Sequence, residues 1–294
     1  MQVEKEVYAN LNRTFFLWAS IVIIFSFTVL PLFYAFYLSL YTGRGIQLEF
    51  GGLENYRRML GDRVVRAALL NNIFFAVILI PVVLTLSILL SNAINKVKSE
   101  KQKGVFSCLL FFPSITSPVA YSFFFRRFFA LDGFLNNFLM RFGIVSDPTN
   151  YLLTPLGARI AIVIVCLWAW TGFYTLLFLS SLQNINPIIY KIAKADGANF
   201  FQIFLKITLP HLKFIILLSS VLLIGGAFQL FAEITIISRG GGPEHSTITL
   251  AYYIFQLSFA FVPQFGYAIS IGILIFVISA FSCFVQLKFG EKNE

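Results

Sequence analysis

The residue types that most often carry catalysis are few in this chain, and none of them forms a catalytic set. The histidines are His211 and His245, and the three cysteines are far apart with no C-x-x-C pair. We expect no metal site, and each cysteine is interpreted as a small apolar residue of the core. No G-x-x-x-x-G-K-[ST] loop occurs, so the chain has no nucleotide-binding site of its own. These patterns predict a protein that is not an enzyme and itself binds no cofactor.

One segment combines charged, small and helix-ending residues in a pattern that indicates a site. It spans 187–210 and reads PIIYKIAKADGANFFQIFLKITLP. Asn186 can cap a helix that starts at the following proline, because a proline in the first turn removes an amide that would be unpaired. Gly197 can supply the turn into a second helix, and Lys191 and Lys194 share one helix face. The segment either contacts a partner or is a surface helix that joins its neighbours.

A second candidate site surrounds Glu233, the only carboxylate that falls inside an apolar span. A charge within a membrane faces a water-filled cavity or a partner, because exposure to lipid costs several kcal/mol. Gln229, one helical turn earlier, is expected on the same face, so both could line a solute pathway. Alternatively, Glu233 pairs with Arg239 as a structural latch. Three aromatic residues could add flat apolar surfaces and a hydroxyl to a pathway, or could pack between helices: Trp168, Trp170 and Tyr174.

The elements that must position these residues are membrane helices. The chain of 294 residues is 58% hydrophobic and 12% charged, against roughly 25% charged residues in soluble domains. Charge-free intervals exceed the roughly 20 residues that cross a bilayer, and backbone groups in lipid must pair within a helix. We predict an all-α polytopic bundle forming a single domain over 1–294, with no cleaved signal peptide. Its six spans are expected at about 14–40, 68–94, 104–125, 157–182, 212–237 and 266–287.

The connections between the spans predict further helices and an orientation. Amphipathic patterns indicate interfacial helices near 53–66 and 134–142, as structural aprons or as binding elements, and another helix is expected near 247–260. Every Lys falls on one side of the membrane, and every Arg except Arg13 falls on the other. A tight Lys-rich loop at 96–103 favours a cytoplasmic location for both termini. The net charge of +9 lies in loops and gives no sign of nucleic-acid binding.

The segment 187–210 resembles the EAA loop of ABC importer permeases, whose pattern is E-A-A, three residues, G, nine residues and I-x-L-P. Lys191 stands where that family usually has Glu, and Ile192 where it has the first Ala, so one charge is reversed. The D-G-A triplet of sugar permeases is also present. The matching residues are Ala193, Asp196, Gly197, Ala198, Ile207, Leu209 and Pro210.

Four further blocks are similar to the carbohydrate branch of the same family, over nearly the whole chain. They are G-L-E-N-Y at 52–56, F-P-S-I-T-S-P-V-A at 112–120, G-G-G-P at 240–243 and Q-F-G-Y-A at 264–268. The G-G-G-P block, followed by Thr247, resembles the loop of the subunit type related to the maltose and glycerol-3-phosphate permeases MalF and UgpA.

The resemblance implies a bacterial inner-membrane permease subunit that imports a sugar or oligosaccharide. It further implies a second, different permease subunit, an extracytoplasmic solute-binding protein, and a dimer of ABC ATPase subunits that use ATP and Mg. The ATPases would hold the EAA helix as a lever on the bundle. An ABC permease for another solute, such as glycerol phosphate, a polyol, a polyamine, phosphate or an amino acid, is the nearest alternative. An ion-coupled secondary transporter would need more ionisable groups within the membrane and internal repeats.

Overall fold

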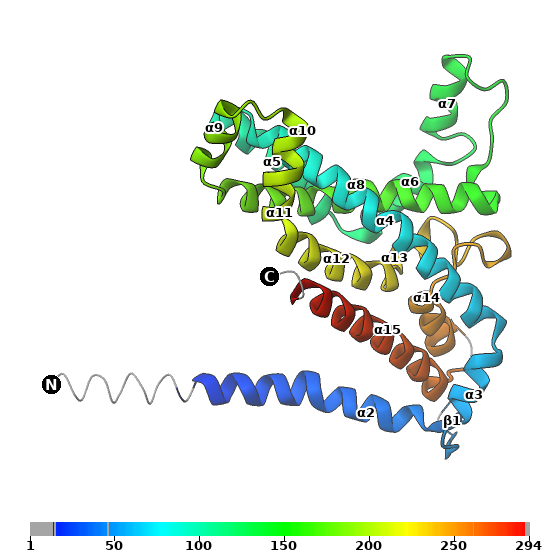
Figure 1. Ribbon diagram of the computed structural model, residues 1–294. Coiled ribbons are helices and arrows are strands. Elements are labelled where there is room, and N and C mark those ends of the chain that lie inside the picture. Colours follow the sequence, from blue (N-terminus) through cyan, green and yellow to red (C-terminus); the bar gives the residue numbers. More distant parts are fainter. Residues whose placement is uncertain (1–13, 15, 46, 261, 292–294) are drawn as a thin grey trace. The chain divides into compact units, whose positions relative to one another are not determined.

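The computed structural model describes residue 14 and residues 16–45, 47–260 and 262–291. These residues are overwhelmingly helical (Figure 1), which confirms the predicted all-α fold. Their contacts form two compact units, Met1–Asp62 with Ile254–Leu274, and Arg63–Tyr253 with Ile275–Glu294. That residues 1–294 form a single transmembrane domain stays a prediction. The location of the two chain ends was also predicted, and residues 1–13 and 292–294 lie outside the described part.

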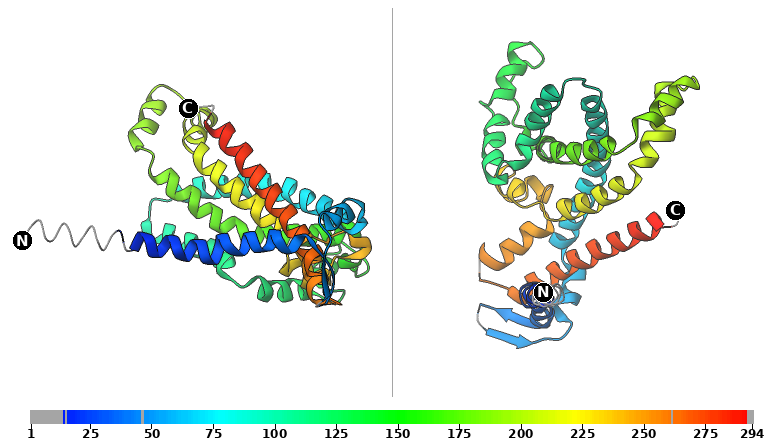
Figure 2. Two further views of the ribbon diagram at one scale, coloured as in Figure 1. Left: turned by 90° about the horizontal axis from the view of Figure 1, so that it is seen from below. Right: turned by 90° about the vertical axis from the view of Figure 1, so that its left-hand side faces the viewer.

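The first unit contains an apolar helix followed by a small hairpin that the sequence analysis did not predict. The helix Phe16–Ser39 includes a π-helical turn at Phe25–Val29 and ends as α2, Leu30–Ser39. Strands β1, Tyr41–Arg44, and β2, Gln47–Phe50, then pair antiparallel and are drawn as two arrows in the right-hand view of Figure 2. Helix α3, Glu54–Gly61, follows. Buried Asn55 joins these elements, because its Nδ2 donates to the backbone oxygens of Ser39 and Tyr41 at 2.8 Å each.

The second unit is a packed bundle of long helices. Helix α4, Arg63–Asn95, packs against α8, Pro155–Gln183, and α12, Lys213–Phe228, while α5, Glu100–Ile115, packs against α8. At the α5–α8 contact, a Cβ added to Gly172 would lie 1.7 Å from the backbone oxygen of Leu110. A side chain at that position would therefore separate the two helices.

The predicted span at 104–125 is not one straight helix. It consists of α5 and α6, Pro118–Phe128, which are bent by 92°. Pro118 lies in the first turn of α6, and Thr116 and Ser117 are extended, as expected for residues that approach a proline. By length and apolar composition, five helices of the described chain can cross a membrane, or six if the bent pair is one span.

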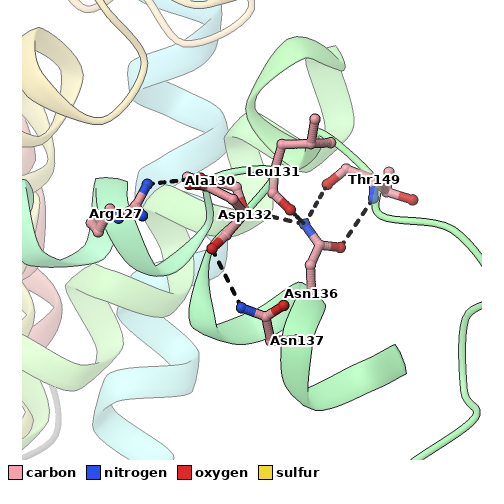
Figure 3. Close-up of polar contacts among 7 residues, drawn as sticks. All are labelled: Arg127, Ala130, Leu131, Asp132, Asn136, Asn137 and Thr149. Atoms are coloured by element: carbon pink, nitrogen blue, oxygen red, sulfur yellow. Dashed lines mark hydrogen bonds and ion pairs between the residues drawn. The ribbon is translucent and has the colours of Figure 1, made fainter. Parts of the chain in front are cut away.

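Helices are present at the three places expected outside the spans, although the one expected near 53–66 ends at Gly61 and residues 63–66 belong to α4. Their location at the membrane interface stays a prediction. They are α3, α7 at Phe134–Arg141, and α14 at Leu250–Phe255 with its π-helical continuation Gln256–Ala260. The connection around α7 is organised by buried Asn136, whose Nδ2 donates to the backbone oxygens of Ala130, Leu131 and Thr149 and whose Oδ1 accepts from the Thr149 amide (Figure 3). Nearby, Arg127 donates to the Asp132 carboxylate at 2.7 Å and lowers the pKa of that carboxyl.

The G-G-G-P loop is held by polar side chains of α4 and α8. Asn71 Nδ2 donates to the backbone oxygens of His245 and Ile248 at 2.8 and 2.9 Å, and Arg159 Nε donates to that of Ser246 at 2.8 Å. Arg159 also donates to Asn71 Oδ1 at 2.9 Å. Glu244 and His245 have positive φ angles of 53° and 58°, a backbone conformation that costs free energy for residues with a Cβ. These contacts therefore fix the loop while its tip stays exposed.

Candidate coupling helix and candidate solute pathway

Helix α9, Pro187–Ala195, forms as its end residues predict. Asn186 caps the helix, because its Oδ1 accepts a hydrogen bond from the Ile188 amide at 3.0 Å. Gly197 ends it with a φ of 79°, and the Ala198 amide donates to the Ala193 oxygen at 2.9 Å. This left-handed glycine with a reverse backbone bond is a common helix ending.

The second helix of the segment also forms, in three consecutive parts. They are α10, Phe200–Ile203, a π-helical turn at Phe204–Thr208, and α11, Leu209–His211. Asn199 and Gln202 form a reciprocal capping box, which the sequence analysis missed although the N-x-x-Q spacing was visible. Pro210 lies in the first turn of α11, where its missing amide is tolerated. The segment thereby leads directly into α12.

One side of α9 is anchored to the bundle. The Tyr190 hydroxyl lies 3.3 Å from Thr208 Oγ1, within hydrogen-bonding distance. Tyr190 and Phe204 also pack against a core cluster that includes Leu182 and Leu212. This cluster contains residues of α8 together with Leu212, the residue before α12. The position of α9 is therefore tied to both membrane helices that flank it.

The opposite side of α9 is open. Ile188 and Ile192 are 57% and 56% exposed, and Lys191 and Lys194 are exposed as well. The α9–α10 segment extends beyond the ends of α8 and α12 (Figures 1 and 2). Of the remaining predicted coupling residues, Asp196, Gly197 and Pro210 are exposed, and four are half-buried: Ala193, Ala198, Ile207 and Leu209. The arrangement offers a short anchored helix to a partner, and the coupling role stays a prediction.

Gln229 and Glu233 do not share a helix face, so that prediction was wrong. Helix α12 ends at Phe228, and α13, Ala232–Ile236, starts only after Phe231, whose φ of −137° is not helical. The spacing of four residues therefore crosses a break in the helix. Gln229 is exposed, whereas Glu233 is buried with 5% of its surface accessible.

Glu233 does not pair with Arg239 in the described structure either, so the latch alternative is also wrong. Its carboxylate instead accepts a hydrogen bond from the Tyr121 hydroxyl. Trp168 packs edge-on against the same tyrosine, with ring centroids 5.9 Å apart. Tyr121 belongs to α6 and Glu233 to α13, so the contact joins two short helices that each follow a break. Sequence reasoning missed Tyr121, and nothing in its aromatic surroundings distinguishes it.

Two of the three aromatic pathway candidates lie in the packed interior. Tyr174 is buried within the core cluster between α4, α8 and α12, and Trp170 packs against three such clusters. Trp168 is 39% exposed and also contacts Phe125, with centroids 5.2 Å apart. These positions favour packing roles for Trp170 and Tyr174.

A cavity of about 350 Å³ lies between α12 and the later part of α15, Phe265–Glu291. Its walls combine small, polar and apolar residues. Gln229 lies at this cavity, as do Gly225, Gly226, Ser279, Ser282 and Cys283. Gly226 packs against Trp170, because a Cβ added to this glycine would lie 3.4 Å from the indole ring. Hydroxyl and amide groups beside small residues can accommodate and hydrogen-bond a polar solute.

Comparison with known proteins identifies the family. Residues 63–289 match the family described as "Binding-protein-dependent transport system inner membrane component". The chain belongs to this family. The lactose transport system permease protein LacF of Rhizobium radiobacter is 38% identical over 288 residues, covering 98% of this chain and 96% of LacF. The arabinooligosaccharides transport system permease protein AraP of Bacillus subtilis is 29% identical over 275 residues, covering 92% of this chain and 84% of AraP.

A solved structure supports the fold. The match is a chain of a bacterial ABC transporter that imports the acidic polysaccharide alginate, with a TM-score of 0.84 and 20% identity. The alignment covers 100% of this chain and 99% of the alginate transporter chain. The family match and this agreement confirm a multi-pass permease of the inner membrane.

Proposed function

We propose that the chain is a transmembrane subunit of an ATP-driven importer for a sugar or oligosaccharide, driven through segment 187–210 by a separate ATPase. The lactose and arabinooligosaccharide relatives support the solute class. The observation that carries the coupling role is the geometry of α9, which is anchored through Tyr190 on one side and exposed on the other. A partner bound to the exposed side would move α8 and α12 together.

The proposal includes the partners and the orientation that such an importer needs. A second, different permease subunit completes the pathway, and an extracytoplasmic solute-binding protein delivers the solute. An ATPase dimer, which uses ATP and Mg, binds α9 on the cytoplasmic side, where both termini also lie. The lysine-rich connection before α5 is on this side in the positive-inside arrangement.

The cavity beside Gln229 is the proposed part of the solute pathway in this chain. Its hydroxyl and amide groups supply hydrogen bonds for sugar hydroxyls, and its glycines leave room for a ring. Glu233 acts instead as a positioning residue, because it is buried against Tyr121. Gln229→Ala is expected to weaken transport of the solute without changing membrane insertion.

The deciding experiment is purification of the chain with its partners from its native membrane, followed by reconstitution and assay of ATP hydrolysis. Sugars and oligosaccharides, each offered with the solute-binding protein, are expected to stimulate hydrolysis. Stimulation by a polyamine, phosphate or amino acid instead would favour the alternative solute classes. Transport driven by an ion gradient without ATP would replace the proposal with a secondary transporter.

A further inference from the structure

The exposed surface of α9 has a definite chemical pattern, which restricts what can bind it. At 3.6 residues per turn, Ile188 and Ile192 lie on the side opposite the anchoring Tyr190, and Lys191 lies beside them. Lys194, four residues after Tyr190, lies farther round the helix toward the side of Tyr190, although its side chain is exposed. The exposed part of the helix is thus an apolar ridge with Lys191 along one edge and Lys194 farther round on the same flank.

The two lysines have no acidic partner within the described chain. Neither Lys191 nor Lys194 forms an ion pair or side-chain hydrogen bond among the described residues. By contrast, Lys103 in the neighbouring α5 is paired with Glu100 at 2.6 Å. Lys96 contributes a further positive charge close by, with its Nζ 4.1 Å from the Phe200 ring centroid. Asp196, two residues after Lys194, is exposed as well, so the segment keeps a positive charge at Lys191 and Lys194 that an acidic group of another protein can match.

We infer that α9 binds an ATPase groove whose floor is apolar and whose wall facing Lys191 and Lys194 is acidic. This inference rests on the proposed function, and it adds the charge that the partner must carry. Complementary charges across an interface increase association rates and exclude wrong partners. Buried isoleucines would supply the apolar contact, since burial of such side chains is the main favourable term in association. The lysines would then select an ATPase with an acidic groove over one with a basic groove.

The test uses the permease subunits of the transporter, freed of their ATPase, in phosphatidylcholine nanodiscs. The ATPase subunit that copurifies with the wild-type chain, and whose sequence contains a phosphate-binding loop, is purified separately as the probe. Its affinity is measured for the wild type, for the double variant Lys191→Glu/Lys194→Glu, and for Lys191→Arg/Lys194→Arg. Lys101→Glu is the matched control, because Lys101 is an exposed lysine in the first turn of α5. Thermal unfolding of each variant verifies that the fold is kept.

We expect the double Glu variant to bind the ATPase at least tenfold more weakly, while the double Arg variant and Lys101→Glu bind as the wild type does. Wild-type affinity should fall as salt rises from 50 to 500 mM, because salt screens exposed charges. An Asp→Lys or Glu→Lys change in the ATPase groove should restore binding to the double Glu variant.

Other outcomes would overturn the inference in distinguishable ways. Equal binding of the wild type and the double Glu variant would refute the acidic groove but leave the proposed coupling role intact. If the double Glu variant binds the ATPase more weakly only when anionic lipid is added to the nanodiscs, the lysines contact lipid headgroups. That outcome would also refute the acidic groove. If no ATPase with a phosphate-binding loop binds the wild-type chain, the proposed function itself fails.

Discussion

Single residues decide how the coupling segment is shaped, and Gly197 is the clearest case. Its φ of 79° allows the chain to turn between α9 and α10, and a Cβ there would meet no atom within 4 Å. Substitution therefore costs only backbone strain within this chain, about 1 kcal/mol. Any larger effect of a new side chain must arise from a bound partner.

For Gly197→Asp we accordingly expect normal insertion in the membrane but loss of solute-stimulated ATP hydrolysis, as a side chain at this turn blocks close approach of the ATPase. Gly143→Asp is the matched control, because Gly143 also has a positive φ, 67°, and open space around it, but follows α7. The backbone strain in Gly143→Asp should be similar to that in Gly197→Asp, while its solute-stimulated ATP hydrolysis should equal that of the wild type. Normal transport by the Gly197 variant would contradict the coupling role.

The buried pair of Tyr121 and Glu233 gives a second prediction at the scale of single residues. Tyr121→Phe removes the hydrogen bond to a buried carboxylate and is expected to lower the free energy of unfolding by about 1.5–3 kcal/mol. Tyr174→Phe is the control, since no hydrogen bond of its hydroxyl is recorded among the described residues. Thermal unfolding in detergent measures both. Equal stability of the two variants would show that the pair contributes little.

At the scale of helices and strands, amino-acid composition predicts some parts of the structure and misses others. Charge-free intervals located the long helices, because lipid requires both apolar side chains and paired backbone groups. The bend before Pro118 was missed because the apolar run continues across it. Hydropathy depends only on which residues are present, so it does not show that the backbone changes direction. The break between Gln229 and Ala232 was missed for a related reason, since helical spacing assumes a continuous helix. The contact of Tyr121 with Glu233 joins residues 112 positions apart, a distance at which local patterns carry no information.

The contact between α5 and α8 can be tested through its glycine. Gly172→Ala places a methyl group against the Leu110 carbonyl, so it should destabilise the second unit by about 1–3 kcal/mol or more. Gly104→Ala in the same α5 is the control, because its Cβ would meet nothing within 4 Å and alanine favours helices. Denaturation followed by circular dichroism should separate the two variants. A stable Gly172→Ala protein would show that the helices can move apart at little cost.

At the scale of the whole molecule, the orientation in the membrane is the main prediction. In the sequence, only the placement of the lysines indicates this orientation. The structure offers two exposed positions at which the orientation can be measured, Lys191 in the proposed coupling helix and Glu244 in the G-G-G-P loop. In a background with the three native cysteines replaced by alanine, Glu244→Cys should react with an impermeant maleimide added to intact cells. In cells that lack the ATPase subunit, which would cover this position, Lys191→Cys should react only after the membrane is opened. The reverse pattern would place α9 outside and remove the basis for coupling to ATP.

The close contact of two helices at Gly172, which has no side chain, affects how the helices can move. With the Leu110 carbonyl lying directly against the backbone of α8, α5 has little freedom to slide or roll independently of that helix. If α9 is displaced at the end of α8, α5 would move together with α8, as far as the bend before Pro118. In the proposed coupling, a movement of α9 would therefore be shared by a rigid two-helix body that ends at the 92° bend between α5 and α6.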